Sequence, residues 1–438
     1  MNARSLAGTL CTRLQRRRVA LAALMTLSAT AATAEFEFNP YASAQHLYDS
    51  NVYRFSRQVA DVTGTTETAD HSQRYAAGVD TGYDWSQQKL RARFEERRIR
   101  YTDFEQLDHN EYLLDAGLES SFLGNTTGVL NFRDERRMAS FDDRRSTDLI
   151  IERDRVGRGS LNIAVTPDWH LLTGARIRNL RSPLPDAPAL PLPAPGAPAR
   201  LASPDFALHE RAYNVGVEFG IENKERIEDV VPLFIGIMLE QQTVTFSGVT
   251  PQPPPPPGVT RETFDGYRLL TLDTTARYTI NHHSSFDGKL GITRDTPRQS
   301  TAGSRLELTG DIGYTRELSA LTEVNARLFR RVVPFVATAD ATTDTGASLG
   351  AKWQPILGFI VLADYAWASS SFRGLSGVDA DNSGRGDKTQ NASLSFSFPV
   401  LRYFGIRMFG TYNDRRSSAA YNDYSSKVGG VELTFRWQ

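Results

Sequence analysis

One short stretch of the sequence matches a catalytic pattern. Gly346-Ala347-Ser348-Leu349-Gly350 has the G-x-S-x-G spacing in which a serine nucleophile sits on a sharp turn between a strand and a helix. In this sequence the pattern lies inside a run of alternating polar and apolar residues, and no helical pattern follows it. Because a nucleophile elbow needs that helix, we interpret the match as chance and predict no enzymatic activity.

A second stretch resembles part of a calcium-binding loop. Oxygen-bearing side chains alternate along residues 379–387, at Asp379, Asp381, Ser383 and Asp387. Calcium loops use such alternation, with a glycine for the sharp turn and an acid at the twelfth position. The twelfth position here is Gln390. We therefore expect a plain Gly- and Asp-rich loop, with weak calcium binding as the alternative and no other metal or cofactor.

Charged residues of both signs recur at every second position in several segments. They are Arg91, Arg93, Glu95, Arg97, Arg176, Arg178, Asp273, Arg277, Arg305, Glu307, Asp311, Glu323 and Arg327. If the other face of each segment is apolar, these side chains share one polar face. They either pair across strands and rigidify a wall or line a hydrated path for a polar solute. An excess of arginine on three segments could attract an anionic solute, through Arg97, Arg98, Arg100, Arg133, Arg136, Arg137, Arg176, Arg178 and Arg181.

Alternating runs must position these side chains. In residues 270–280, for example, leucine, alanine, tyrosine and isoleucine occupy most of the even positions, and threonine, aspartate and arginine occupy the others. This period of two is that of a β-strand with one apolar and one polar face. The runs last ten to sixteen residues, whereas ordinary strands average about five or six. Long alternating runs separated by turns are typical of transmembrane antiparallel up-and-down β-barrels, whose closure leaves no unpaired backbone edge in lipid.

The runs give eighteen candidate strands, with sixteen as the lower bound. The connections between them alternate between short and long, as in outer-membrane barrels with short periplasmic turns, long outer loops and both termini in the periplasm. Long outer loops are expected near 56–71, 182–205, 247–263 and 373–387. Two of these regions hold fourteen of the 21 prolines, which would each remove a ladder hydrogen bond within a central strand.

The first 34 residues have the pattern of a secretory signal peptide. Five arginines and no acidic residue precede a short apolar run that ends in Ala32-Thr33-Ala34. We expect residues 1–34 to be removed and residues 35–438 to form the barrel. Removal would leave 45 basic against 51 acidic residues and no cysteine. That balance argues against nucleic-acid binding and leaves no disulfide or thiol chemistry.

The start of the expected mature chain resembles a known family of barrels. Glu35-Phe36-Glu37-Phe38-Asn39-Pro40-Tyr41 is followed by Tyr48-Asp49-Ser50-Asn51-Val52-Tyr53-Arg54-Phe55. These segments resemble the opening of the EpsL-type exopolysaccharide-associated outer-membrane barrels of the β-barrel porin 2 group. The resemblance implies a non-catalytic outer-membrane pore through which a secreted polysaccharide leaves, working with periplasmic polysaccharide export and co-polymerase proteins.

Three functions remain open from the sequence. Polysaccharide export leads, a general or solute-specific diffusion porin is the alternative, and an outer-membrane enzyme is the third. The last run, Val431, Leu433, Phe435 and Trp437, resembles the C-terminal strand signal of bacterial barrels. It adds the barrel assembly machinery to the expected partners, beside outer-membrane lipid and lipopolysaccharide.

Overall fold

The structure is a computed structural model of the 438-residue chain. It describes residues 35–59, 67–122, 124–142, 147–182, 206–221, 233–247, 266–298, 303–335, 340–372, 385–419 and 422–437. The expected leader 1–34 and the proline-rich stretches lie outside the described residues. Among the described residues, no helix has the length and apolar character needed to cross a membrane.

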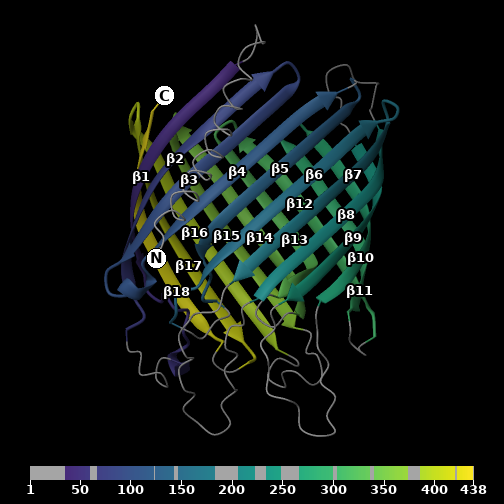
Figure 1. Cartoon of the computed structure of the whole chain (residues 1–438). Coiled ribbons are helices and arrows are strands. Elements are labelled where there is room, and N and C mark those ends of the chain that lie inside the picture. The colour runs from purple at the N-terminus through teal and green to yellow at the C-terminus, as the bar shows by residue number, and fades with distance from the viewer. Residues whose placement is uncertain are drawn as a thin grey trace, which may run out of the picture.

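Eighteen strands make up almost all of the described chain (Figure 1). They are β1 (Glu35–Asp49), β2 (Asp70–Trp85), β3 (Gln88–Tyr101), β4 (His109–Phe122), β5 (Thr126–Met138), β6 (Ile151–Ala164), β7 (Trp169–Ser182), β8 (Phe206–Ile221), β9 (Leu233–Ser247), β10 (Gly266–Asn281), β11 (Ser284–Pro297), β12 (Arg305–Ser319), β13 (Thr322–Phe335), β14 (Asp340–Ile356), β15 (Phe359–Phe372), β16 (Gly386–Leu401), β17 (Phe404–Ser417) and β18 (Tyr424–Arg436). A single 3-10 turn, η2 (Glu105–Leu107), follows β3.

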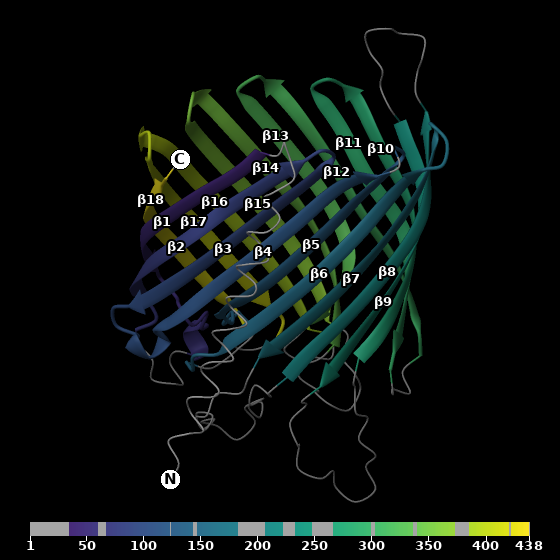
Figure 2. The same cartoon turned by 45° about the horizontal axis from the view of Figure 1, so that its top comes forward.

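The strands form one closed antiparallel barrel. Each strand pairs with its neighbours in sequence, and β1 also pairs with β18, so the sheet has no free edge strand. Short connections such as 86–87, 282–283 and 320–321 lie at one end. Longer connections lie at the other, which is the lower end in Figures 1 and 2. The predicted up-and-down barrel with about eighteen strands is confirmed.

Contacts that skip a strand identify the inner face. Tyr41 of β1 bonds to Glu95 of β3, and Arg277 of β10 pairs with Glu218 of β8. Side chains converge in this way only on the concave side of a curved sheet. The opposite face carries exposed apolar side chains such as Leu272, which fits the lipid-facing surface of a membrane barrel.

The first strand differs from its predicted bounds. The alternating pattern predicts a strand over 38–55, but β1 begins at Glu35 and ends at Asp49. Residues 51–55 form a turn instead. Pro40 lies within β1, one residue before Tyr41, whose pair with Arg436 is the last of the β1–β18 ladder. The Pro40 carbonyl accepts a hydrogen bond from the Trp437 N–H at 2.9 Å. Because Pro40 lies at the end of that ladder, its missing N–H removes no bond from the interior of the strand pair.

Candidate functional site

The candidate site is the inner wall of the barrel. Alternation and register place all thirteen of the predicted charged residues on the inner face, the same face that carries the Tyr41–Glu95 and Arg277–Glu218 contacts. The opposite positions on the same strands hold exposed apolar residues such as Leu90, Ile177 and Leu308. The wall charges are thus gathered on one surface by strand geometry.

Carboxylates and arginines occupy different depths on this wall. The Glu210 and Glu218 side chains are each 4% exposed, whereas Arg277 is 56% exposed. The short carboxylates lie against the sheet, and the longer arginines reach over them. Because inward-facing arginines remain accessible, the lumen is not packed solid beside them. Beside Glu210 and Glu218, a solute inside the barrel therefore meets guanidinium groups before carboxylates.

One group of wall residues is centred on Glu95. Its carboxylate accepts hydrogen bonds from the Tyr41 hydroxyl, from Arg97 and from Arg93, the last at 2.8 Å. Tyr41 reaches Glu95 by crossing over Gly78 of β2, where an added Cβ would lie 2.6 Å from the tyrosine ring. Glycine at position 78 therefore makes this contact possible.

A second group lies on β7 to β10. Arg176 donates to Glu210, which also accepts a hydrogen bond from Gln242 at 2.9 Å. Arg277 donates to Glu218 and lies over the Phe234 ring, with its guanidinium carbon 5.0 Å from the ring centre. Arg178 bonds to Asp154. Glu210, Glu218 and Asp154 were not among the predicted wall residues, although the period-two alternation of their strands places them inward.

The remaining predicted wall residues are more dispersed. Arg327 pairs with Asp311, and Glu307 pairs with Arg330 at 3.0 Å. Asp273 is buried beside Gly291, where a Cβ would collide with its carboxylate. The structure places three others on the same face: Arg91, paired with Asp84; Arg305, opposite Asp295; and Glu323, opposite Lys352.

The arginine excess is divided between two surfaces. Of the nine arginines expected to attract a solute in the lumen, Arg97, Arg133, Arg137, Arg176 and Arg178 face inward. Arg98, Arg100, Arg136 and Arg181 share the outward face with Phe94, Phe132 and Ile177. For these four residues the lumen expectation is wrong, because each lies an odd number of residues from an inward neighbour.

The calcium-like stretch is only partly described. Asp379, Asp381 and Ser383 lie outside the described residues. Asp387 opens β16, where its carboxylate pairs with Arg385 at 2.5 Å and accepts a hydrogen bond from Ser417. Across the described part of the chain, no group of three or more potential ligands could hold a metal ion.

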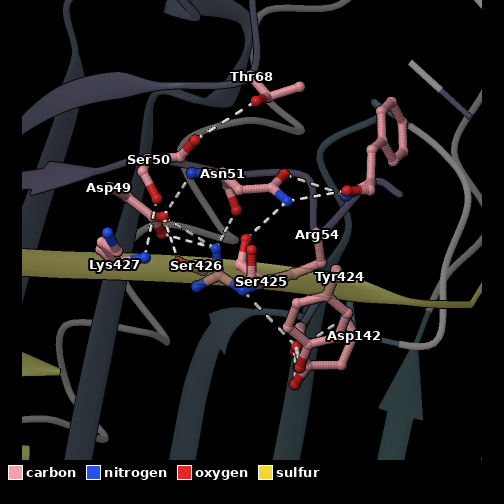
Figure 3. Close-up of polar contacts among 12 residues, drawn as sticks. Asp49, Ser50, Asn51, Arg54, Thr68, Asp142, Tyr424, Ser425, Ser426 and Lys427 are labelled. Atoms are coloured by element: carbon pink, nitrogen blue, oxygen red, sulfur yellow. Dashed lines mark hydrogen bonds and ion pairs between the residues drawn. The ribbon is translucent and has the colours of Figure 1, made fainter. Parts of the chain in front are cut away.

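The segment 49–55 holds the closing strand pair, β1 and β18, at the end of the barrel with the long connections. Asn51 donates from its side chain to the backbone oxygens of Phe55 and Ser425, at 2.9 and 3.1 Å. Its side-chain oxygen accepts the Phe55 N–H, which closes the turn. Ser426 donates to Asp49 at 2.7 Å. Figure 3 shows this segment lying along β18.

Arg54 extends the same contacts to another connection. Its φ of 56° lies in the left-handed region, which residues other than glycine seldom adopt. The side chain pairs with Asp49 at 2.8 Å and lies 3.7 Å from Asp142 of the β5–β6 connection. Asp142 also accepts a hydrogen bond from Tyr424 of β18 (Figure 3). Two connections and the start of β18, all distant in sequence, are thus joined at the barrel mouth.

An aromatic cluster lies beneath these contacts. Tyr53 packs against Phe55, Phe104 and Phe141, with ring centres 4.8 to 5.4 Å apart. Only 1% of Tyr53 is exposed, and its hydroxyl accepts a hydrogen bond from Gln106. Burial raises the pKa of Tyr53 to about 12. The cluster makes this part of the mouth a packed structure.

A second apolar cluster joins strands at the mouth that are not neighbours in the sheet. Leu208 of β8, Val244 of β9 and Tyr267 of β10 are fully buried and share a cluster with Ala341 of β14. Val332 of β13 packs against it. Strands β11 and β12 separate β10 from β13 in the sheet, so these contacts cross the barrel interior. The mouth is therefore narrower than the ring of strands.

The closed sheet, the outward apolar face and the accessible charged interior together define a transmembrane β-barrel. No family model matches the chain, and no curated protein matches it. The barrel is similar to the siderophore receptor PirA from Acinetobacter baumannii, with 7% identity and a TM-score of 0.47 over 92% of this chain and 80% of that one. It is also similar to OccK1 (OpdK) from Pseudomonas aeruginosa, with 12% identity and a TM-score of 0.43 over 92% and 99% of the two chains. At these values the likenesses carry no functional argument.

Proposed function

We propose that this protein is an outer-membrane channel that exports a secreted acidic polysaccharide. The accessible guanidinium layer over nearly buried carboxylates supports the proposal most directly. Barrels of sixteen to eighteen strands are wide enough to hold an aqueous channel. The resemblance of residues 35–55 to the EpsL-type barrels supports a polymer as the cargo.

The arrangement of the arginines suits a polymer that must both enter and leave. Arg93, Arg97, Arg176, Arg178, Arg277 and Arg327 are already paired with carboxylates, so their attraction for a passing anion is partly neutralised. Repeated weak sites along a path permit movement, whereas one strong site would hold the cargo. The polar side chains of the wall attract the anionic polymer and keep the lumen hydrated. Transport makes or breaks no covalent bond.

Anion-selective diffusion of small solutes is the second candidate. The same accessible arginines would raise the local concentration of small anions in the lumen. The two functions predict different outcomes when the gene is deleted, because only the export function requires the channel for polymer to reach the cell surface.

A deletion strain tests the export function. We expect surface polymer to be lost while polymer stays in the periplasm, and the wild-type gene to restore export. A variant with Arg176→Gln, Glu210→Gln, Arg277→Gln and Glu218→Gln keeps the net charge but removes two exposed guanidiniums, so we expect it to restore export only in part.

Arg316→Gln is the matched control, because Arg316 is exposed on the outward face near the short-turn end. It should restore export fully. Unchanged surface polymer in the deletion strain would overturn the export proposal. Ion selectivity of the purified channel in a planar bilayer would then test diffusion, with anion preference expected in the wild type and reduced in the quadruple variant.

A further inference from the structure

The outward face of strands β5 to β7 carries a row of arginines. Arg136 lies opposite Arg153 across β5 and β6, and Arg153 lies opposite Arg181 across β6 and β7. Side chains directly opposite on one face have Cβ atoms about 5 Å apart, and like charges there destabilise a sheet. Asp134 of the barrel pairs with the middle arginine, Arg153, so Arg136 and Arg181 are the members of the row that an anion outside the barrel would neutralise.

Further arginines surround the row and complete what we call the outer arginine patch. Its members are Arg98, Arg136, Arg153, Arg155, Arg181 and Arg211, all on the outward face. Outward carboxylates beside them are Glu96 and Asp134. Asp134 is already engaged by Arg153, at 2.8 Å, and by Arg155, at 3.3 Å.

Four members of the patch keep their charge uncompensated. Within the described ranges, Arg98, Arg136, Arg181 and Arg211 form no ion pair with a carboxylate. All four are exposed. An arginine presents a planar fork of donors that matches a phosphate, so the row of Arg136, Arg153 and Arg181 fits a phosphorylated ligand, with Arg98 and Arg211 on the flanking strands.

The surface next to the patch is apolar. Phe132, Ile177 and Tyr213 are 43%, 47% and 52% exposed on the same outward face, and each lies closer to the middle of its strand than the patch arginine of that strand. A ligand with a phosphorylated head and hydrocarbon chains would contact both surfaces at once. Free phosphate would contact only the arginines and gain nothing from the apolar side chains.

We propose that the outer arginine patch binds a phosphorylated lipid, and we assign that lipid as lipid A, the membrane anchor of lipopolysaccharide. Arg136 and Arg181 lie within two residues of the ends of β5 and β7, at the end with the long connections. That end faces the cell exterior in outer-membrane barrels. The inference rests on the outer-membrane location and is independent of what passes through the lumen.

The test uses the full chain purified in a non-ionic detergent, with binding measured by native mass spectrometry. Lipid A with both phosphates is compared with dephosphorylated lipid A and with inorganic phosphate alone. We expect retention of the phosphorylated lipid only. A variant with Arg136→Gln, Arg153→Gln and Arg181→Gln should bind it about 100-fold more weakly.

Two further variants make the result interpretable. Arg181→Gln alone removes one exposed side chain near a strand end and should weaken binding about fivefold without affecting folding. Arg316→Gln with Arg402→Gln removes two basic residues near the short-turn end and should leave affinity unchanged. Equal binding of dephosphorylated lipid A, equally tight binding of inorganic phosphate, or unchanged affinity in the folded triple variant would overturn the proposal.

Discussion

Asn51 illustrates how one side chain fixes a segment of the barrel mouth. Its amide both donates and accepts, so it closes the turn to Phe55 and reaches the backbone of Ser425. Since Asn51 is buried, loss of its amide leaves backbone groups without partners, at a cost of about 1 to 3 kcal/mol for a buried group. The effect is local, because the barrel ladders do not depend on this turn.

Replacement of Asn51 by alanine should release this segment while leaving the barrel folded. We expect faster trypsin cleavage after Arg54 or Arg57, measured by mass spectrometry of the native protein over time. Asn125→Ala is the matched control, because Asn125 bonds to the Ala164 backbone at the opposite end of the barrel. Equal cleavage rates in Asn51→Ala and wild type would show that the segment is held by other contacts.

Tyr53 should make the mouth sensitive to high pH. Its folded-state pKa of about 12 lies above the unfolded value of 10. The associated stabilisation is therefore fully present below pH 10 and is lost as the pH rises through 12. The difference in phenolate absorbance between wild type and Tyr53→Phe should titrate near pH 12. A difference that titrates near pH 10 would show that Tyr53 is exposed to water.

At the scale of elements, strand alternation explains both surfaces of the barrel. On β7, for example, Arg176 and Arg178 face the lumen while Ile177 and Arg181 face outward. A shift of one residue would exchange the two sets. The strand register is therefore favoured by both faces. Apolar side chains must face lipid on one side, and the ion pairs must form in the lumen on the other.

The apolar cluster of β7 to β10 should contribute to both stability and pore size. Leu208→Ala creates a cavity in the cluster and should lower the free energy of unfolding by about 2 to 5 kcal/mol. It should also raise the single-channel conductance, because this cluster connects to β13 and β14 across the interior. Leu349→Ala, on the lipid-facing side, is the control and should change neither quantity as much. Unchanged conductance in Leu208→Ala would exclude the cluster from the conducting path.

Strand number and antiparallel order could be predicted from the sequence, because the period-two pattern is local. The end of β1 could not, since the turn at Asn51 depends on Ser425, which lies 374 residues later in the chain. The lumen charges could be predicted in part. Arg136 was misplaced although Phe132, four residues earlier on the same face, indicates that it points outward.

For the whole molecule, the distribution of connections sets an orientation in the membrane. The short connections and the end of β18 lie at one end, and the mouth contacts lie at the other. If the barrel has the usual outer-membrane orientation, the mouth faces the cell exterior.

Cysteine labelling on intact cells tests this orientation. The only cysteine is Cys11, within the expected leader. A membrane-impermeant maleimide should label Glu105→Cys on intact cells and Gln87→Cys only after the outer membrane is permeabilised. Labelling of Gln87→Cys on intact cells would reverse the orientation and would place the outer arginine patch at the inner leaflet.

The contacts of Asp49, Ser50 and Asn51 with β18 also bear on the order in which the molecule is assembled. Strands β2 to β18 can each add to the strand made just before, but the second partner of β1 is β18, which is synthesised last. Residues 49–51 meet residues 425–427 only after the full chain has been exported. These contacts therefore form at the final step of assembly, and a truncated chain that lacks β18 cannot complete it.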